Sequence, residues 1–134
     1  MIEPRGIAHF SIPVTDVEKS TAFYTDIVGC THLFTTPPKT MAFIDAGGMC
    51  LILCKCDGPV NPVPQDHNGV HHSFLVDSDK FRDNIKFLQD NGVEVFFEED
   101  RQKGVVNGPR AYFRDPDGTV LEIIDLTSYS GAEQ

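Results

Sequence analysis

Two stretches of the sequence decide the fold, because they repeat one pattern in the two halves of the chain. The first reads His9-Phe10-Ser11-Ile12-Pro13-Val14-Thr15-Asp16, and the second reads His71-His72-Ser73-Phe74-Leu75-Val76-Asp77-Ser78. In both, histidine comes first, serine follows two residues later and valine five residues later. A polar residue that can cap a helix comes next. The repeat therefore predicts a strand followed by a helix in each half.

Each half also ends on a turn and an apolar strand. The two stretches read Asp45-Ala46-Gly47-Gly48-Met49-Cys50-Leu51-Ile52 and Asp115-Pro116-Asp117-Gly118-Thr119-Val120-Leu121-Glu122. Superimposing the halves places Ile52 opposite Glu122, so that His9, His71 and Glu122 lie at matching depths of a duplicated fold. Two histidines and one carboxylate can hold one divalent ion and leave coordination positions open, which favours Fe(II) or Mn(II). Zn(II), Ni(II) and Co(II) are the alternatives.

Length and charge narrow the class of protein. The chain has 134 residues, enough for one domain, with 11 Lys plus Arg against 20 Asp plus Glu and a formal charge of −9. This acidity argues against binding to nucleic acid or to an anionic membrane. The start of the chain lacks a signal-peptide core, and no apolar run approaches the roughly 20 residues of a membrane span. We expect a cytoplasmic protein that acts on a small molecule.

The order of the predicted elements is β-α-β-β-β twice, an α+β fold in one domain spanning 1–134. Module 1 (6–56) has strands at 6–14, 31–36, 40–45 and 49–56, and a helix that Thr15 or Asp16 caps and that ends near Val28. A proline-rich connector (57–69) leads to module 2 (70–126). This has strands at 70–76, 93–98, 109–114 and 119–125, a helix capped by Ser78, and a polar loop at 99–108. The polar tail (127–134) is expected to fray.

Each module is expected to be a curled sheet with one helix on its outer face. The two sheets are predicted to pair into a partly closed mixed sheet around a cavity. Because small modules with open sheets tend to close on a partner, we also expect a homodimer. The four cysteines, Cys30, Cys50, Cys54 and Cys56, are interpreted as reduced buried thiols, with contact to a metal or substrate as the alternative.

These motifs resemble the vicinal oxygen chelate superfamily over about residues 6–126. The resemblance rests on His9–Val14, on Asp16–Tyr24 with Gly29, and on Tyr112–Gly118 followed by Glu122. The superfamily holds glyoxalase I, extradiol dioxygenases, fosfomycin-resistance thiol transferases, methylmalonyl-CoA epimerase and bleomycin-binding proteins. The resemblance implies the fold more strongly than any one reaction, because one scaffold carries many chemistries.

The resemblance implies metal ligands on the first and last strands of each module. Here these positions are His9, Ile52, His71 and Glu122, so the carboxylate or amide that glyoxalase-like members have at the second position is missing. Three ligands remain, as in the ring-cleavage dioxygenases and the fosfomycin transferases. His71 is preferred to His72, because only His71 matches His9 in phase with Val76. His72 is interpreted as structural.

Tyr112 is the predicted catalytic partner of Glu122. It lies across the hairpin around Gly118, and the resemblance places a tyrosine at this spacing beside the metal. Its phenol can hydrogen-bond a metal-bound oxyanion; a purely packing role is the alternative. Strand alternation puts Arg110 and Arg114 on the same face. The predicted substrate-binding residues are these two arginines together with Ser11, Ile52 and Ser73.

The function prediction has one main form and two alternatives. The main form is a metal-dependent enzyme that chelates adjacent oxygens of a small metabolite, either a dioxygenase or a glyoxalase-like lyase or isomerase. One alternative is a metal-dependent thiol transferase or detoxification enzyme, and the other is a metal-free drug-binding protein. The catalytic histidine of the dioxygenases is missing by spacing, with His67 as the only stand-in. The tail after Glu122 has no Lys or Arg, which argues against the phosphonate-binding cluster of the fosfomycin transferases.

Overall fold

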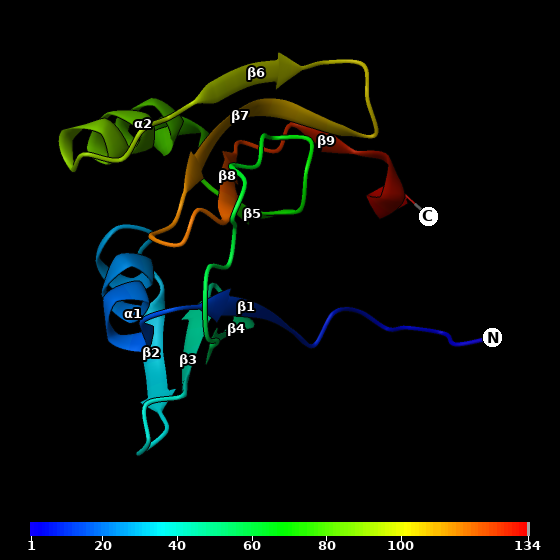
Figure 1. Cartoon of the computed structure of the whole chain (residues 1–134). Helices are drawn as coiled ribbons and strands as arrows, with labels where there is room; N and C mark the ends of the chain where they lie inside the picture. Colours follow the sequence, from blue (N-terminus) through cyan, green and yellow to red (C-terminus); the bar gives the residue numbers. More distant parts are fainter. Residues whose placement is uncertain (134) are drawn as a thin grey trace. The chain divides into compact units, whose positions relative to one another are not determined.

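The computed structural model describes residues 1–133, with side chains through residue 131. The chain forms two compact units, Met1–Pro62 and Val63–Gln134 (Figure 1). The elements of the first unit are β1 (His9–Val14), α1 (Val17–Asp26), β2 (Thr31–Thr35), β3 (Met41–Ala46) and β4 (Met49–Lys55). Its four strands form one mixed sheet in the order β1-β4-β3-β2, in which β1 runs parallel to β4.

The second unit repeats this plan. Its elements are β5 (His71–Leu75), η1 (Ser78–Lys80), α2 (Phe81–Asp90), β6 (Phe97–Arg101), β7 (Val106–Arg114), β8 (Val120–Ile124), β9 (Ser128–Tyr129) and η2 (Ser130–Glu133). The sheet order is β5-β8-β7-β6, with β5 parallel to β8, and β9 pairs with β7. The predicted α+β duplication is therefore confirmed as two mixed sheets. Their pairing into one curled, closed sheet stays a prediction.

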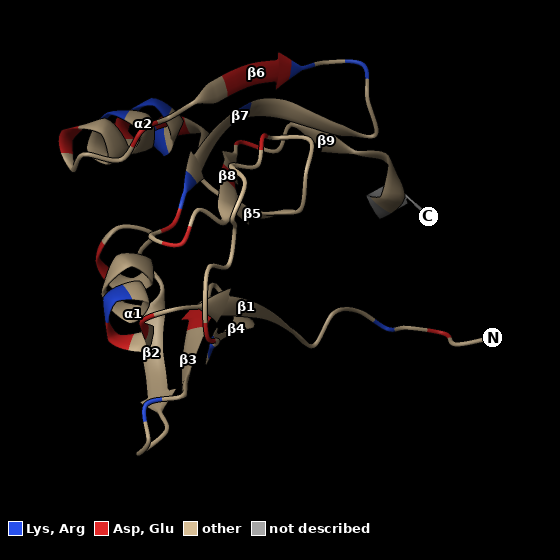
Figure 2. Ribbon diagram, in the orientation of Figure 1, with Lys and Arg blue, Asp and Glu red and all other residues tan. Residues whose placement is uncertain are grey.

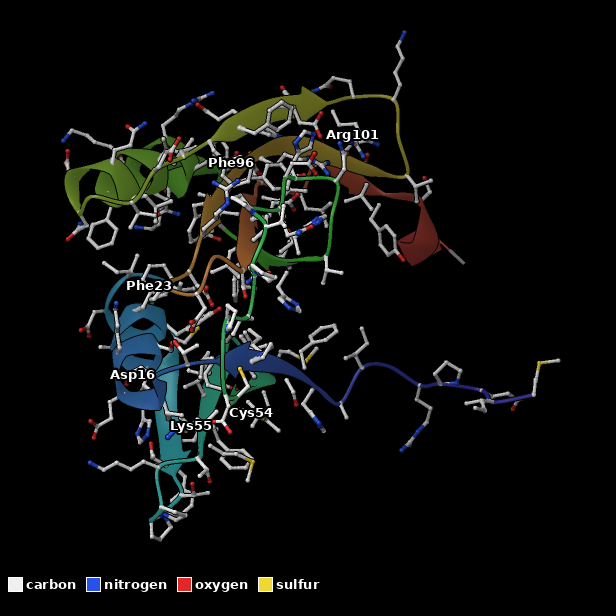
Figure 3. The ribbon with its side chains drawn as sticks, in the orientation of Figure 1. Asp16, Phe23, Cys54, Lys55, Phe96 and Arg101 are labelled. Atoms are coloured by element: carbon white, nitrogen blue, oxygen red, sulfur yellow. The ribbon has the colours of Figure 1, made fainter. Side chains whose placement is uncertain are left out.

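The core of the first unit lies on the face of the sheet that α1 contacts. Ile12, Val14, Leu51 and Leu53 alternate into this face and are fully or almost fully buried, as is Tyr24 of α1. Asp16 caps the helix by accepting a hydrogen bond from the backbone N–H of Lys19, as Figure 3 shows at the start of α1. The other face carries the side chains that alternate with the core, including those of His9 and Ser11.

The second unit uses the same division between its two faces. The core face buries Ala111, Phe113, Leu121 and Ile123, and α2 buries Phe81, Ile85 and Leu88, which recur at helical spacing. His72 pairs with Leu121 in the β5–β8 register and is therefore on this face, as predicted. Burial is the main cause that lowers the pKa of His72, and the charge of the nearby His71 is the second cause. The opposite face carries His71, Ser73, Tyr112 and Glu122.

Several predicted boundaries in the second unit are wrong. Ser78 does not cap an α-helix: its hydroxyl donates to Asp125 at 2.8 Å, and a short 3-10 turn precedes α2. The strand expected at 93–98 is β6, which begins at Phe97 and takes in the start of the expected polar loop. It is an edge strand, and it carries the acidic residues Glu98, Glu99 and Asp100, which are coloured red in Figure 2.

The tail is better ordered than predicted. Ser128 and Tyr129 pair with Asn107 and Val106, and the Asn107 amide donates to the Ser128 hydroxyl at 2.8 Å. A polar segment can pair with a strand through backbone hydrogen bonds alone. The tail therefore lacks the apolar pattern by which a strand is recognised in a sequence. Within the described chain no helix has the length and apolarity of a membrane span.

Candidate functional site

The face of the second sheet opposite its core face brings several of the predicted site residues into one row. Strand register places Ser73 of β5 beside Glu122 of β8, Glu122 beside Tyr112 of β7, and Tyr112 beside Phe97 of β6. Side chains at paired positions of neighbouring strands point to the same face. His71 lies on the same face of β5, two residues before Ser73. The row exists because β5, β8 and β7 pair without a register shift.

Glu122 is the buried acid of this row, with only 3% of its surface exposed. Its Oε2 accepts a hydrogen bond from the Ser73 hydroxyl. Its Oε1 has no hydrogen-bond partner and lies 3.9 Å from Nη1 of Arg110. A buried carboxylate is stable only when its charge and lone pairs are compensated. One oxygen of Glu122 therefore has an unused lone pair that a cation can take.

His71 lies beside that oxygen. Its Nε2 is 3.8 Å from Oε1 of Glu122, and its Nδ1 is 3.0 Å from the carbonyl oxygen of Gly69. In the tautomer in which Nδ1–H donates to this carbonyl, Nε2 presents a lone pair. Backbone carbonyls commonly orient metal-binding histidines in this way.

The two groups fit a shared divalent ion. Bonds from zinc to histidine nitrogen and carboxylate oxygen are about 2.0–2.2 Å, so two ligand atoms of one ion are at most about 4.3 Å apart. The separation of 3.8 Å lies within that limit, and Oε1 accepts no hydrogen bond. Among residues 1–133 no three His, Cys, Asp or Glu side chains gather as a complete ligand set. The second unit therefore supplies two candidate ligands.

Tyr112 closes the row beside Glu122 and is 3% exposed. Burial, and after it the interaction with Glu122, raises the pKa of Tyr112 to about 12, although Arg110 acts in the opposite direction. The phenol is therefore neutral at physiological pH and is a hydrogen-bond donor rather than a base. Its ring meets that of His71 edge-on, with 5.5 Å between centroids.

The predicted arginines differ in their surroundings. Arg110 is 4% exposed and donates to the carbonyl oxygens of Gly108 and Val106, so its guanidinium is held within the protein beside Glu122. Arg114 donates from Nη2 to the Gln65 carbonyl at 2.7 Å and stacks on Phe96 at 3.8 Å. Its buried Nε has no hydrogen-bond partner. This donor is enclosed by the protein.

The second half of the predicted connector lies against this row, and it carries His67, the residue that the sequence offered as a stand-in for the catalytic histidine. Arg114 holds Gln65, and two residues later the His67 ring stacks on Phe97 with 3.8 Å between centroids. His67 is also 5.4 Å from the Tyr112 ring. The sequence signal for this arrangement was a histidine in a proline-rich stretch; its stacking on Phe97 follows from the tertiary structure. Figure 3 labels Phe96 and Arg101 near the two ends of β6.

The remaining predicted residues lie in the first unit, on the open face of its sheet. His9 pairs with Cys50, and Ser11 pairs with Ile52. These pairs are the counterparts of His71 with Val120 and Ser73 with Glu122, so the predicted equivalence of Ile52 and Glu122 is confirmed. Cys50 and Cys54 are half-buried free thiols on this face, whereas Cys30 is buried. Burial, with a contribution from Asp45, raises the pKa of Cys30 to about 11.

Comparison with known proteins identifies the family. The model of the Glyoxalase/Bleomycin resistance protein/Dioxygenase superfamily matches residues 6–123. The chain belongs to this superfamily. It is 32% identical over 120 residues to metallothiol transferase FosB of Staphylococcus saprophyticus, covering 89% of this chain and 76% of the relative. It is also 25% identical over 119 residues to glutathione transferase FosA of Serratia marcescens, covering 89% and 79%.

A solved structure shares the fold. It is the genomically encoded fosfomycin resistance protein FosX from Listeria monocytogenes, complexed with Mn(II) and a sulfate ion. It superimposes with a TM-score of 0.74 at 24% identity and covers 91% of this chain and 90% of that one. The family recognition made from the motifs is thus confirmed. Among the predicted functions, the relatives agree better with the thiol transferase than with the dioxygenase or lyase.

We predict that the protein binds one divalent ion per chain through His9, His71 and Glu122. His9→Ala should therefore lower the affinity for Mn(II) sharply, because one of three ligand atoms is lost. His72→Ala is the matched control, since His72 faces the core, and it should change thermal stability more than metal content. Titration calorimetry with Mn(II) measures the affinity and stoichiometry of both variants, and thermal melting measures their stability. Unchanged affinity and stoichiometry in His9→Ala would remove His9 from the site.

We also predict that Ile52→Glu tightens metal binding by adding the carboxylate that glyoxalase-like members have at this position. A new carboxylate beside Ser11 is costly without a cation and favourable with one. The variant should melt below the wild type when metal-free, and added Mn(II) should raise its melting temperature more than that of the wild type. Equal shifts in the two proteins would show that position 52 does not reach the ion.

Proposed function

We propose that this protein is a metal-dependent transferase that joins a low-molecular-weight thiol to a small electrophile. The main support is the pair of a partly exposed His71 and a buried Glu122, in which a carboxylate oxygen that accepts no hydrogen bond lies 3.8 Å from a histidine nitrogen. The names of the relatives, metallothiol transferase and glutathione transferase, agree with this class of reaction. The proposal takes His9 of the first unit as the third ligand, as the sequence repeat predicts.

The reaction needs an electrophilic carbon bonded to an oxygen that leaves it. A sulfur–carbon bond forms, the carbon–oxygen bond breaks with its electrons on oxygen, and the proton of the thiol ends on that oxygen. A divalent ion, when bound, supplies a positive charge that stabilises the developing oxyanion. Mn(II) is the first ion to test, because it suits a set of two histidines and one carboxylate.

The side chains around Glu122 have distinct parts in this proposal. Tyr112 remains protonated, since its pKa is about 12, and donates a hydrogen bond to the substrate oxygen as negative charge develops. Arg114, which is partly exposed, supplies positive charge on the same face of β7 for an acidic group of the substrate. Arg110 neutralises Glu122 and is already satisfied by two carbonyl oxygens, so it acts on the carboxylate more than on the substrate.

The proposal is tested by incubating the protein with Mn(II), fosfomycin and glutathione, and by following loss of free thiol and formation of the adduct by mass spectrometry. Cysteine and other small thiols, and water alone, form the comparison arms. Metal-dependent adduct formation with any of the thiols supports the proposal. Metal-dependent hydration without thiol consumption would replace it with a hydrolase. A set of non-phosphonate epoxides in the same assay reports whether the tail, which lacks Lys and Arg, excludes phosphonates.

Tyr112→Phe separates chemistry from packing. The variant keeps the ring and removes only the hydroxyl, so turnover should fall by roughly ten- to a thousand-fold, as expected for loss of one oxyanion donor. The melting temperature and Mn(II) affinity should change little. Tyr129→Phe is the control, because Tyr129 lies in the tail, in β9. Normal turnover in Tyr112→Phe, or a large loss of stability, would assign Tyr112 to the core.

The association of two chains into a homodimer stays a prediction.

A further inference from the structure

The orientation of the Glu122 carboxylate is set by one neighbour. Ser73 lies directly across from Glu122 in the parallel β5–β8 pair, and its hydroxyl donates to Oε2. The other oxygen, Oε1, is buried without a hydrogen bond and lies beside Nε2 of His71. A carboxylate rotated about its last bond exchanges its two oxygens or turns both away. The serine hydroxyl resists that rotation, because turning would break a hydrogen bond to a charged group.

The first unit contains the same serine without the acid. Ser11 lies across from Ile52 in the parallel β1–β4 pair, at the position that corresponds to Ser73 across from Glu122. The two serines therefore share their strand position and their sheet environment, and differ in whether a carboxylate faces them. A role in strand pairing would apply to both serines, whereas a role in holding a ligand applies to Ser73 alone. The duplication thus provides a matched comparison within one chain.

We propose that Ser73 is a positioning residue of the candidate metal centre, which holds Glu122 so that Oε1 faces the position beside Nε2 of His71. This rests on the proposed function, since it concerns the same ion. Outer hydrogen bonds to ligand carboxylates typically change metal affinity by about 10- to 100-fold when they are removed. Ser73 does not itself contact the reacting atoms, so its effect is expected in binding of the ion before any effect on turnover.

The experiment measures Mn(II) affinity of the full chain by titration calorimetry, together with the melting temperature of the metal-free protein. Ser73→Ala should weaken Mn(II) binding by about 10- to 100-fold. Ser73→Thr keeps the hydroxyl on a residue that suits a strand and should restore affinity to near the wild-type value. Ser73→Cys keeps the size of the side chain with a weaker donor and should fall between them. Ser78→Ala removes a hydroxyl that donates to the Asp125 carboxylate of the same unit, and it should bind Mn(II) like the wild type.

Each outcome decides between the two proposals. Tight binding by the wild type with unchanged affinity in Ser73→Ala overturns the positioning role and leaves the metal-dependent function standing. Equal losses in Ser73→Ala and Ser78→Ala also overturn it, because they point to general damage to the second unit. Failure of Ser73→Thr to restore affinity while Ser73→Cys binds like the wild type points to the shape of the side chain rather than its hydroxyl, and overturns it too. No Mn(II) binding by the wild type overturns the proposed function and the positioning role together.

Discussion

The carboxylate of Glu122 is buried and is not solvated by water. The groups around it in the second unit therefore have to compensate its negative charge. Ser73 donates to one oxygen, and Arg110 places a guanidinium 3.9 Å from the other. Arg110 itself stays buried because two carbonyl oxygens accept its N–H groups. The strand register that delivers Ser73 and Tyr112 to the same row is therefore inseparable from the stability of the acid. The one oxygen left without a hydrogen bond is the place where this compensation is incomplete.

The surroundings of that oxygen strengthen any interaction made there. The rings of His71, Tyr112, His67 and Phe97 lie close to one another, with His67 stacked on Phe97. Aromatic surfaces exclude water, and electrostatic interactions are larger where water is excluded. The same exclusion raises the pKa of Tyr112 and keeps its phenol a donor. Burial thus keeps the Tyr112 phenol protonated in the row of the sheet that holds Glu122.

The two halves of the chain show how one scaffold can carry unequal chemistry. Both sheets have a parallel first and last strand, a helix on one face, and histidine and serine on the other. The counterpart of Glu122 is Ile52, so the first half carries a histidine next to apolar side chains and thiols. A buried carboxylate needs a serine, an arginine and a cation around it, whereas an isoleucine needs only apolar contacts. The sequence therefore changes the chemistry of a module by one residue without changing its fold.

The sequence by itself determined the duplication, the element order and the equivalence of Ile52 with Glu122. Repeated motifs and the period of apolar residues are local properties, and they survive in any environment that buries one face. Helical spacing of apolar residues accounts for the burial of Phe81, Ile85 and Leu88. Strand alternation accounts for the position of His72 on the core face. The family also followed, because His9–Val14 and Tyr112–Gly118 occur together in a fixed order.

Only the tertiary structure decided what depends on residues distant in the sequence. The start of β6 at Phe97 and the pairing of the tail with β7 depend on which edge is free, which polar composition does not reveal. The placement of Gln65 and His67 against the second sheet depends on Arg114, Phe96 and Phe97, from another part of the chain. The hydrogen bond from Ser73 to Glu122 joins residues 49 positions apart. Such contacts arise from the register of paired strands, and register is a property of the assembled sheet.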